Sequence, residues 1–291
     1  MYIGIDLGTS GVKLILVQKD GVILKTISKS YDLLIPKPSW SEQDPNEWFK
    51  QTEIALKELV IGYEDSIKGI SFSGQMHGLV LLDEFDQVLR NAILWNDQRT
   101  VDEVEYLNNV IGIDNLLKYT GNIALTGLTA PKVLWVKNNE PETFKRIHKV
   151  MLPKDYLIYR LSGKFASDVS DLSGTLYFDC EKREYSKEML EILDLNTSML
   201  PKVFESYEVV GLLKEEFKEV IEGNYGITDL KSYTDYKIKA GQNGITQQEI
   251  DLLSPDNINS SSFWEYIEKN PEIARDAISF GMTKEKSREE V

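Results

Sequence analysis

The distribution of apolar residues at the start of the chain predicts β-strands. β-Forming residues occupy 2–7 and 12–17, on either side of the short segment Gly8–Gly11. Two such runs joined by a glycine-rich segment are typical of a β-hairpin. A third strand is expected over 21–28, after a turn at 19–21. The chain therefore should begin with three antiparallel strands.

A helix and more strands follow. Asp44 is suited to the N-cap and Pro45 to the first helical position of this helix. Apolar or small side chains then recur at roughly helical spacing, at Trp48, Phe49, Thr52, Leu56 and Leu59. The next strand, 67–73, suggests a crossover back onto the hairpin sheet. Strands are also expected at 79–82 and 92–95, and this order of elements predicts an α/β fold.

The segment from about 98 to 205 is predicted to be mostly helical. Helices are expected over 129–135, 141–147, 152–161 and 185–193. Residues 166–174 form a polar stretch with two carboxylates, for which we expect a loop.

Composition narrows the possible partners. The formal net charge of the 291 residues is −14, which disfavours nucleic acid and anionic membranes because both require a basic face. No apolar run approaches the length of a membrane helix, and the N-terminus does not resemble a signal peptide. Cys180 is the only cysteine, so no internal disulfide can form, which favours a cytoplasmic location. A nucleotide or another small molecule remains a possible partner.

The segment Gly8–Gly11 is a candidate anion-binding turn. Glycines allow close approach of backbone N–H groups to a ligand, and successive N–H groups can cradle anionic oxygens. Thr9 and Ser10 add hydroxyl donors, and Lys13 adds a positive charge. Asp6 precedes the turn and could hold Mg²⁺ through water. The alternative interpretation is an ordinary hairpin turn.

Two other segments combine groups that could bind a sugar. Gly74–Gly78 follows a predicted strand, where α/β folds place their sites, and contains Gln75 and His77. Its alternative interpretation is a turn with a surface histidine. The segment 95–99 combines Trp95 and Asp97 with amides and a guanidinium. Its alternative is a helix N-terminus capped by Asp97.

Asp168 and Asp171 lie three residues apart in the polar stretch. The two carboxylates could act as an acid/base pair. A solvated loop or a helix cap is the commoner explanation of such a pattern.

Several of these segments together resemble the FGGY carbohydrate kinases and, within that family, the xylulokinases. The segment 127–139 fits the first family signature at each defined position. The resemblance runs from about residue 1 to 220, with motifs in the family's order: 5–13, 40–45, 74–78, 93–97, 127–139, 152–156 and 165–171.

The resemblance implies an actin-like ATPase (ribonuclease-H-like) α/β fold, with a mixed sheet and flanking helices. It implies phosphorylation of D-xylulose by ATP with Mg²⁺, giving D-xylulose 5-phosphate. The turn residues Gly8, Thr9, Ser10 and Gly11, with Lys13, would face the ATP phosphates, and Asp6 would orient Mg²⁺. The residues expected at the sugar are Gln75, Met76, His77, Trp95 and Asp97.

The C-terminal part of the sequence departs from the family. In the family the catalytic aspartate normally lies in a glycine-rich loop. The counterpart of this loop here, 239–246, contains no aspartate, and we do not assign the catalytic role to the upstream Asp235. We expect a sugar-binding domain over 1–240 and a divergent tail over 241–291 in place of the second kinase domain. The chain by itself should then be impaired or inactive, with a homodimer or a complementing chain as a possible partner. The alternative is a non-catalytic sugar-binding or regulatory relic.

Overall fold

The computed structural model describes residues 1–63 and 66–217. Its largest sheet contains β1 (Tyr2–Leu7), β2 (Gly11–Val17), β3 (Ile23–Ser30) and β5 (Gly69–Gly74), in the order β3-β2-β1-β5. β1 and β2 pair antiparallel, as do β2 and β3, whereas β5 runs parallel to β1. The predicted hairpin, the third strand and the crossover are therefore confirmed.

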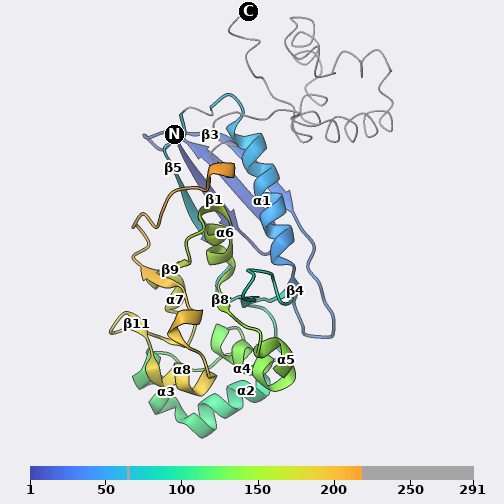
Figure 1. Cartoon of the computed structure of the whole chain (residues 1–291), viewed down its shortest axis with the longest axis vertical. Coiled ribbons are helices and arrows are strands. Elements are labelled where there is room, and N and C mark those ends of the chain that lie inside the picture. Colours follow the sequence, from blue (N-terminus) through green and yellow to red (C-terminus); the bar gives the residue numbers. More distant parts are fainter. Residues whose placement is uncertain (64–65, 218–291) are drawn as a thin grey trace, which may run out of the picture.

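Two helices cover one face of this sheet, α1 (Pro45–Val60) and α6 (Pro153–Ser162) (Figure 1). As predicted, α1 begins with Pro45, and the Asp44 side chain accepts a hydrogen bond from the N–H of Asn46. Alternate strand residues point into the core beneath the helices: Ile3, Ile5, Leu7, Val12, Leu14 and Leu16. This alternation leaves Asp6 and Lys13 on the other face of the sheet.

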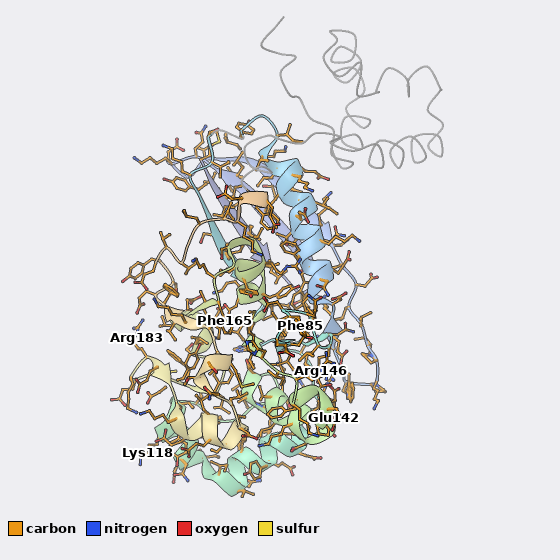
Figure 2. The ribbon with its side chains drawn as sticks, in the orientation of Figure 1. Phe85, Lys118, Glu142, Arg146, Phe165 and Arg183 are labelled. Atoms are coloured by element: carbon orange, nitrogen blue, oxygen red, sulfur yellow. The ribbon has the colours of Figure 1, made fainter. Side chains whose placement is uncertain are left out.

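A second apolar core lies among helices beyond the sheet (Figure 1). These helices are α2 (Val101–Glu105), the π-helix η2 (Tyr106–Gly112), α3 (Ile113–Thr120), α4 (Thr129–Asn139), α5 (Pro141–Phe144) and α8 (Lys187–Leu193). In Figure 2 the side chains fill this region, and Lys118, Glu142 and Arg183 lie at its periphery. The helices expected at 129–135, 141–147, 152–161 and 185–193 are all present, with shifted ends.

Short strands form further two-stranded pairs. These pairs join β4 (Glu42–Gln43) to β7 (Ala92–Ile93), β6 (Val80–Leu82) to β8 (Lys149–Met151), β9 (Ala166–Asp168) to β12 (Lys202–Phe204), and β10 (Phe178–Asp179) to β11 (Glu184–Tyr185). β6 and β7 confirm the strands expected at 79–82 and 92–95, whereas the other six, five of them between 98 and 205, were not predicted. A 3₁₀ helix, η3 (Thr197–Met199), precedes β12. Strands of two or three residues are too short to show a period in the sequence.

The expectation of a loop over 166–174 was wrong. This stretch forms β9 and then the short helix α7 (Val169–Leu172). Pairing of β9 with a distant strand and burial of Ala166 and Leu172 supply the stability that the polar local sequence does not indicate.

The mixed sheet with flanking helices confirms the predicted α/β class. In the described part of the chain, none of the helices has the length and apolar character needed to span a membrane. The proposed domain boundary at 240, the loop 239–246, Asp235 and the tail 241–291 lie outside the described residues.

Candidate functional site

The β1–β2 turn, Gly8–Gly11, is held by backbone packing. The Gly8 N–H donates to the Gly11 carbonyl at 3.0 Å, and the Tyr31 hydroxyl donates to the Gly8 carbonyl at 2.5 Å. A Cβ on Gly11 would lie 2.4 Å from the Lys29 carbonyl oxygen of β3. Gly11 is thus required by close approach of two strands, a reason independent of any ligand.

Ionisable and hydroxyl groups surround this turn on its open side. Asp6 lies opposite Lys13 on β2 and opposite Ser73 on β5, and the Asp6, Lys13 and Ser10 side chains are exposed. Burial, followed by the nearby Asp6 charge, raises the pKa of the Tyr31 phenol. Among the described residues no cluster of three metal-binding side chains occurs. A single carboxylate fits Mg²⁺, which keeps most of its waters when one or two protein carboxylates bind it.

Gln43 connects this turn to the interior. Its amide nitrogen donates to the Thr9 carbonyl at 2.7 Å, and its amide oxygen accepts from the Trp48 indole N–H at 3.0 Å. A carbonyl can only accept and an indole N–H can only donate, so these two contacts fix the orientation of the Gln43 amide. Gln43 is 1% exposed, so its position is set entirely by the protein.

The orientation of Gln43 determines that of Gln75. The Gln75 side-chain nitrogen donates to the Gln43 amide oxygen at 3.1 Å, and the Gln75 backbone N–H donates to the Leu7 carbonyl at 2.7 Å. The remaining amide oxygen of Gln75 is buried and has no hydrogen-bond partner among the described residues. A buried, unpaired acceptor costs free energy and marks a place where a ligand or a local rearrangement could supply a donor.

His77 lies in a tightly held loop after β5. Its backbone is left-handed, with φ of 64°, and its ring Nδ1 lies 3.0 Å from the Gly174 carbonyl oxygen. The His77 carbonyl accepts from Lys132 Nζ at 2.7 Å and from the Thr129 hydroxyl at 3.3 Å. A Cβ on Gly174 would lie 2.2 Å from the ring, so only glycine fits there. The neighbouring Met76 is half-buried.

Trp95 connects the two candidate regions directly. Its indole N–H donates to the Thr9 hydroxyl at 3.0 Å, although the residues are 86 positions apart, and 47% of Trp95 is exposed. A Cβ on Gly127 would lie 2.9 Å from the Trp95 carbonyl oxygen. An exposed aromatic face therefore lies beside the β1–β2 turn.

Asp97, two residues after Trp95, is buried, and its carboxylate oxygens have hydrogen-bond partners. Its carboxylate accepts from the Ser41 N–H at 2.6 Å and from Arg99 Nε and Nη2 at 2.9 and 2.7 Å. Arg99 also lies 2.8 Å from Glu42 and 3.7 Å from the centre of the Trp40 ring. The N-cap of α2 is Thr100, so the interpretation of Asp97 as that cap was wrong.

Asp168 and Asp171 belong to a buried ionic cluster. Both pair with Lys154, which lies 2.9 Å from Asp171, and the Asp168 side chain caps α7. The pKa of Asp168 is lowered by Lys154 in spite of partial burial, which alone would raise it. Burial raises the pKa of the adjacent Asp155 to about 7. The cap explanation of this pattern is confirmed.

Comparison with known proteins identifies the family. Residues 1–227 match the model of the FGGY family of carbohydrate kinases, N-terminal domain. The chain belongs to the FGGY family. It is 46% identical to the xylulose kinase of Klebsiella pneumoniae over 219 residues, which cover 74% of this chain and 44% of that protein. The chain thus spans about half the length of the curated relatives that it matches.

Solved structures of FGGY kinases share the fold. A xyloylose kinase from Brucella ovis is 42% identical, with a TM-score of 0.71, over 74% of this chain and 45% of that one. A ligand-bound xylulose kinase from Lactobacillus acidophilus is 30% identical, with a TM-score of 0.72, over 76% and 45%. These similarities confirm the predicted actin-like ATPase fold.

Sequence reasoning missed three residues on which this FGGY site depends. Gln43, Lys132 and Lys154 contact the candidate site residues or hold them in place. Each is within a segment that carried the family resemblance, which was the only available signal. Gln43 and Lys132 contact Thr9 and His77, which are 34 and 55 positions away, so local spacing could not reveal these contacts.

Proposed function

We propose that this chain carries the sugar-binding half of a xylulose kinase, which transfers phosphate from ATP to D-xylulose. The hydrogen bond between Trp95 and Thr9 is the observation that supports this proposal most directly. It joins an exposed aromatic face, of the kind that sugars stack on, to a turn whose Ser10 hydroxyl is exposed. Phosphoryl transfer requires this adjacency, because it depends mainly on positioning and charge neutralisation.

In this proposal the residues divide into two groups around the reacting phosphate. Gly8, Thr9, Ser10, Gly11 and Lys13 would face the ATP phosphates, and Asp6 would hold Mg²⁺ through water, which neutralises phosphate charge. The sugar would contact Gln75, Met76, His77 and Trp95. Asp97 would contribute by fixing the loop through Ser41 and Arg99, because its carboxylate is already paired.

The chemical step transfers a phosphoryl group to a sugar hydroxyl. The hydroxyl oxygen bonds to the γ-phosphorus, the bond from that phosphorus to the bridging oxygen breaks, ADP leaves, and the hydroxyl proton passes to a base. We assign this base to none of the described carboxylates near the site, since Asp97, Asp168 and Asp171 are held in ion pairs. We therefore propose that the chain by itself binds sugar and transfers phosphate slowly or not at all.

The pairing of these carboxylates favours one alternative function. A protein that binds a sugar without phosphorylating it needs the hydrogen-bonding groups of the site and no base. The division into a sugar-binding domain over 1–240 and a separate segment over 241–291 is part of both proposals. Complementation by a second copy or another chain would restore turnover only in the first.

Sugar binding can be tested with the chain itself. In ligand-observed NMR, D-xylulose should bind the 291-residue protein with a Kd in the millimolar range, about −4 kcal/mol. His77→Ala should weaken binding, and His148→Ala, which changes an exposed histidine, should not. Equal binding by wild type and His77→Ala would contradict the site. Coupled measurement of ADP release with ATP and Mg²⁺, in the presence of a complementing chain, then separates the kinase from the alternative.

A further inference from the structure

Lys132 is a fully buried lysine in α4 without an ion-pair partner among the described residues. Its ammonium donates to two backbone carbonyls, that of His77 at 2.7 Å and that of Gly127 at 2.6 Å. A buried cation normally requires a carboxylate, so carbonyl partners alone are a costly arrangement. The arrangement joins the loop before β6 to the loop before α4.

The carbonyl that Lys132 holds belongs to a residue with an unfavourable backbone. A non-glycine residue at a φ of 64° persists only where its surroundings determine its conformation. The Thr129 hydroxyl donates to the same carbonyl at 3.3 Å. Two side chains of one helix terminus therefore fix the peptide group that orients the His77 ring.

The position of the ring decides which nitrogen carries the proton. Nδ1 faces the Gly174 carbonyl at 3.0 Å, and a carbonyl oxygen can only accept, so Nδ1 is the donor. In the neutral ring Nε2 then keeps its lone pair. The absence of a Cβ on Gly174 permits this approach, because a Cβ there would overlap the ring.

We propose that Lys132 is a positioning residue that acts through His77. By holding the His77 carbonyl, it keeps the imidazole as the Nδ1–H tautomer, with Nε2 available to accept a hydrogen bond from a hydroxyl of the substrate. The substrate part of this inference rests on the proposed function, whereas the tautomer does not.

The charges around His77 are consistent with a neutral ring. Burial lowers the His77 pKa most, Lys132 on α4 lowers it further, and the Gly174 hydrogen bond and Asp171 on α7 raise it. Burial also lowers the pKa of Lys132 to about 7, with Asp97 opposing and Arg99 reinforcing the shift.

The two histidines of the chain make a direct test possible, because long-range ¹H–¹⁵N NMR resolves His77 with His148 as the internal reference. In wild type His77 should be the Nδ1–H tautomer, the minor form in free histidine. In Lys132→Met the tautomer should become mixed, the His77 pKa should rise, and D-xylulose should bind about tenfold more weakly. Lys132→Arg, which keeps the donors, should recover part of each change. Lys137→Met removes a half-exposed lysine of the same helix and should leave all three unchanged.

Thr129→Val provides a milder variant in case Lys132→Met does not fold, and it should shift the tautomer less in the same direction. An Nε2–H tautomer in wild type would overturn the inference. An unchanged tautomer and unchanged sugar affinity in Lys132→Met would overturn it while leaving the proposed function intact. Absence of D-xylulose binding in wild type, with the predicted tautomer present and sensitive to Lys132, would instead refute the proposed function alone.

Discussion

The β1–β2 turn and the His77 loop are built in opposite ways. The turn joins neighbouring strands, and its Ser10, Asp6 and Lys13 side chains face solvent. The His77 loop is fixed by Thr129, Lys132 and Gly174, which lie 52 to 97 positions away, and one of these anchors is a buried charge. The comparison shows that adjacent strands form the β1–β2 turn, whereas the conformation of the His77 loop depends on contacts with residues far away in the sequence.

Of the substitutions considered, Arg99→Met should lower the free energy of unfolding most. The arginine is 1% exposed, and its loss leaves the buried carboxylates of Asp97 and Glu42 with fewer partners. We expect the free energy of unfolding to fall by about 3–5 kcal/mol in urea titrations. Arg183→Ala, which removes an exposed pair with Glu205, should cost about 0–1 kcal/mol. Similar losses in both variants would contradict the importance of the buried cluster.

The pH dependence of stability should arise on the side of the His77 loop. Burial raises the pKa of Asp155 from 3.8 to about 7, so between these values the folded state holds a proton that the unfolded state has released. Stability then falls as pH rises through this window, with a slope of roughly 1.4 kcal/mol per pH unit. Asp155→Asn should flatten the curve.

Other groups do not obscure this measurement. The lowered pKa values of Asp83, Asp86 and Asp168 affect stability only where pH falls below about 4. The lowered pKa values of His77 and Lys132 have the opposite sign, since each adds stability as pH rises above the folded-state pKa, and both are the same in wild type and variant. Identical slopes in urea titrations from pH 4.5 to 7.5 would therefore rule out Asp155 as their source.

Thr9→Val should have the smallest effect on stability. It tests the contact between the β1–β2 turn and Trp95. The variant removes the acceptor of the Trp95 indole N–H at a half-exposed site. We expect a loss of about 0.5–1 kcal/mol of stability and a changed Trp95 indole N–H shift in NMR. Thr26→Val, on β3 in the same sheet, serves as the control. An unchanged indole shift in Thr9→Val would show that the hydrogen bond does not form in solution.

Local features of the sequence predicted the elements that local interactions determine. The hairpin, the Asp44 cap and the parallel strand β5 followed from side-chain period, capping chemistry and the crossover rule. The stretch 166–174 was misread, because β9 depends on pairing with β12, 36 positions later at Ala166 and Lys202. Tertiary pairing of this kind overrides local polarity.

The candidate site was only partly accessible to sequence reasoning. Gln75, His77 and Trp95 were identified by residue type, and the structure brings Gln75 and Trp95 to the β1–β2 turn through Gln43 and Thr9. The burial of Asp97 could not be foreseen, because its partner Ser41 is 56 positions away. Sequence spacing shows which side chains share a helix or strand. It does not show which side chains hydrogen-bond to one another and so are not free to bind a ligand.

The Gln43 amide has a consequence for how two ligands affect each other's affinity. Both of its ends are occupied, one by the carbonyl of Thr9 and the other by Trp48 and Gln75. A displacement of the turn on one side must either break a bond of this amide or move Gln75 on the other. If a ligand at the turn changes the affinity of a second ligand at Gln75, the second ligand must change the affinity of the first by the same factor, because thermodynamic linkage between two sites is reciprocal.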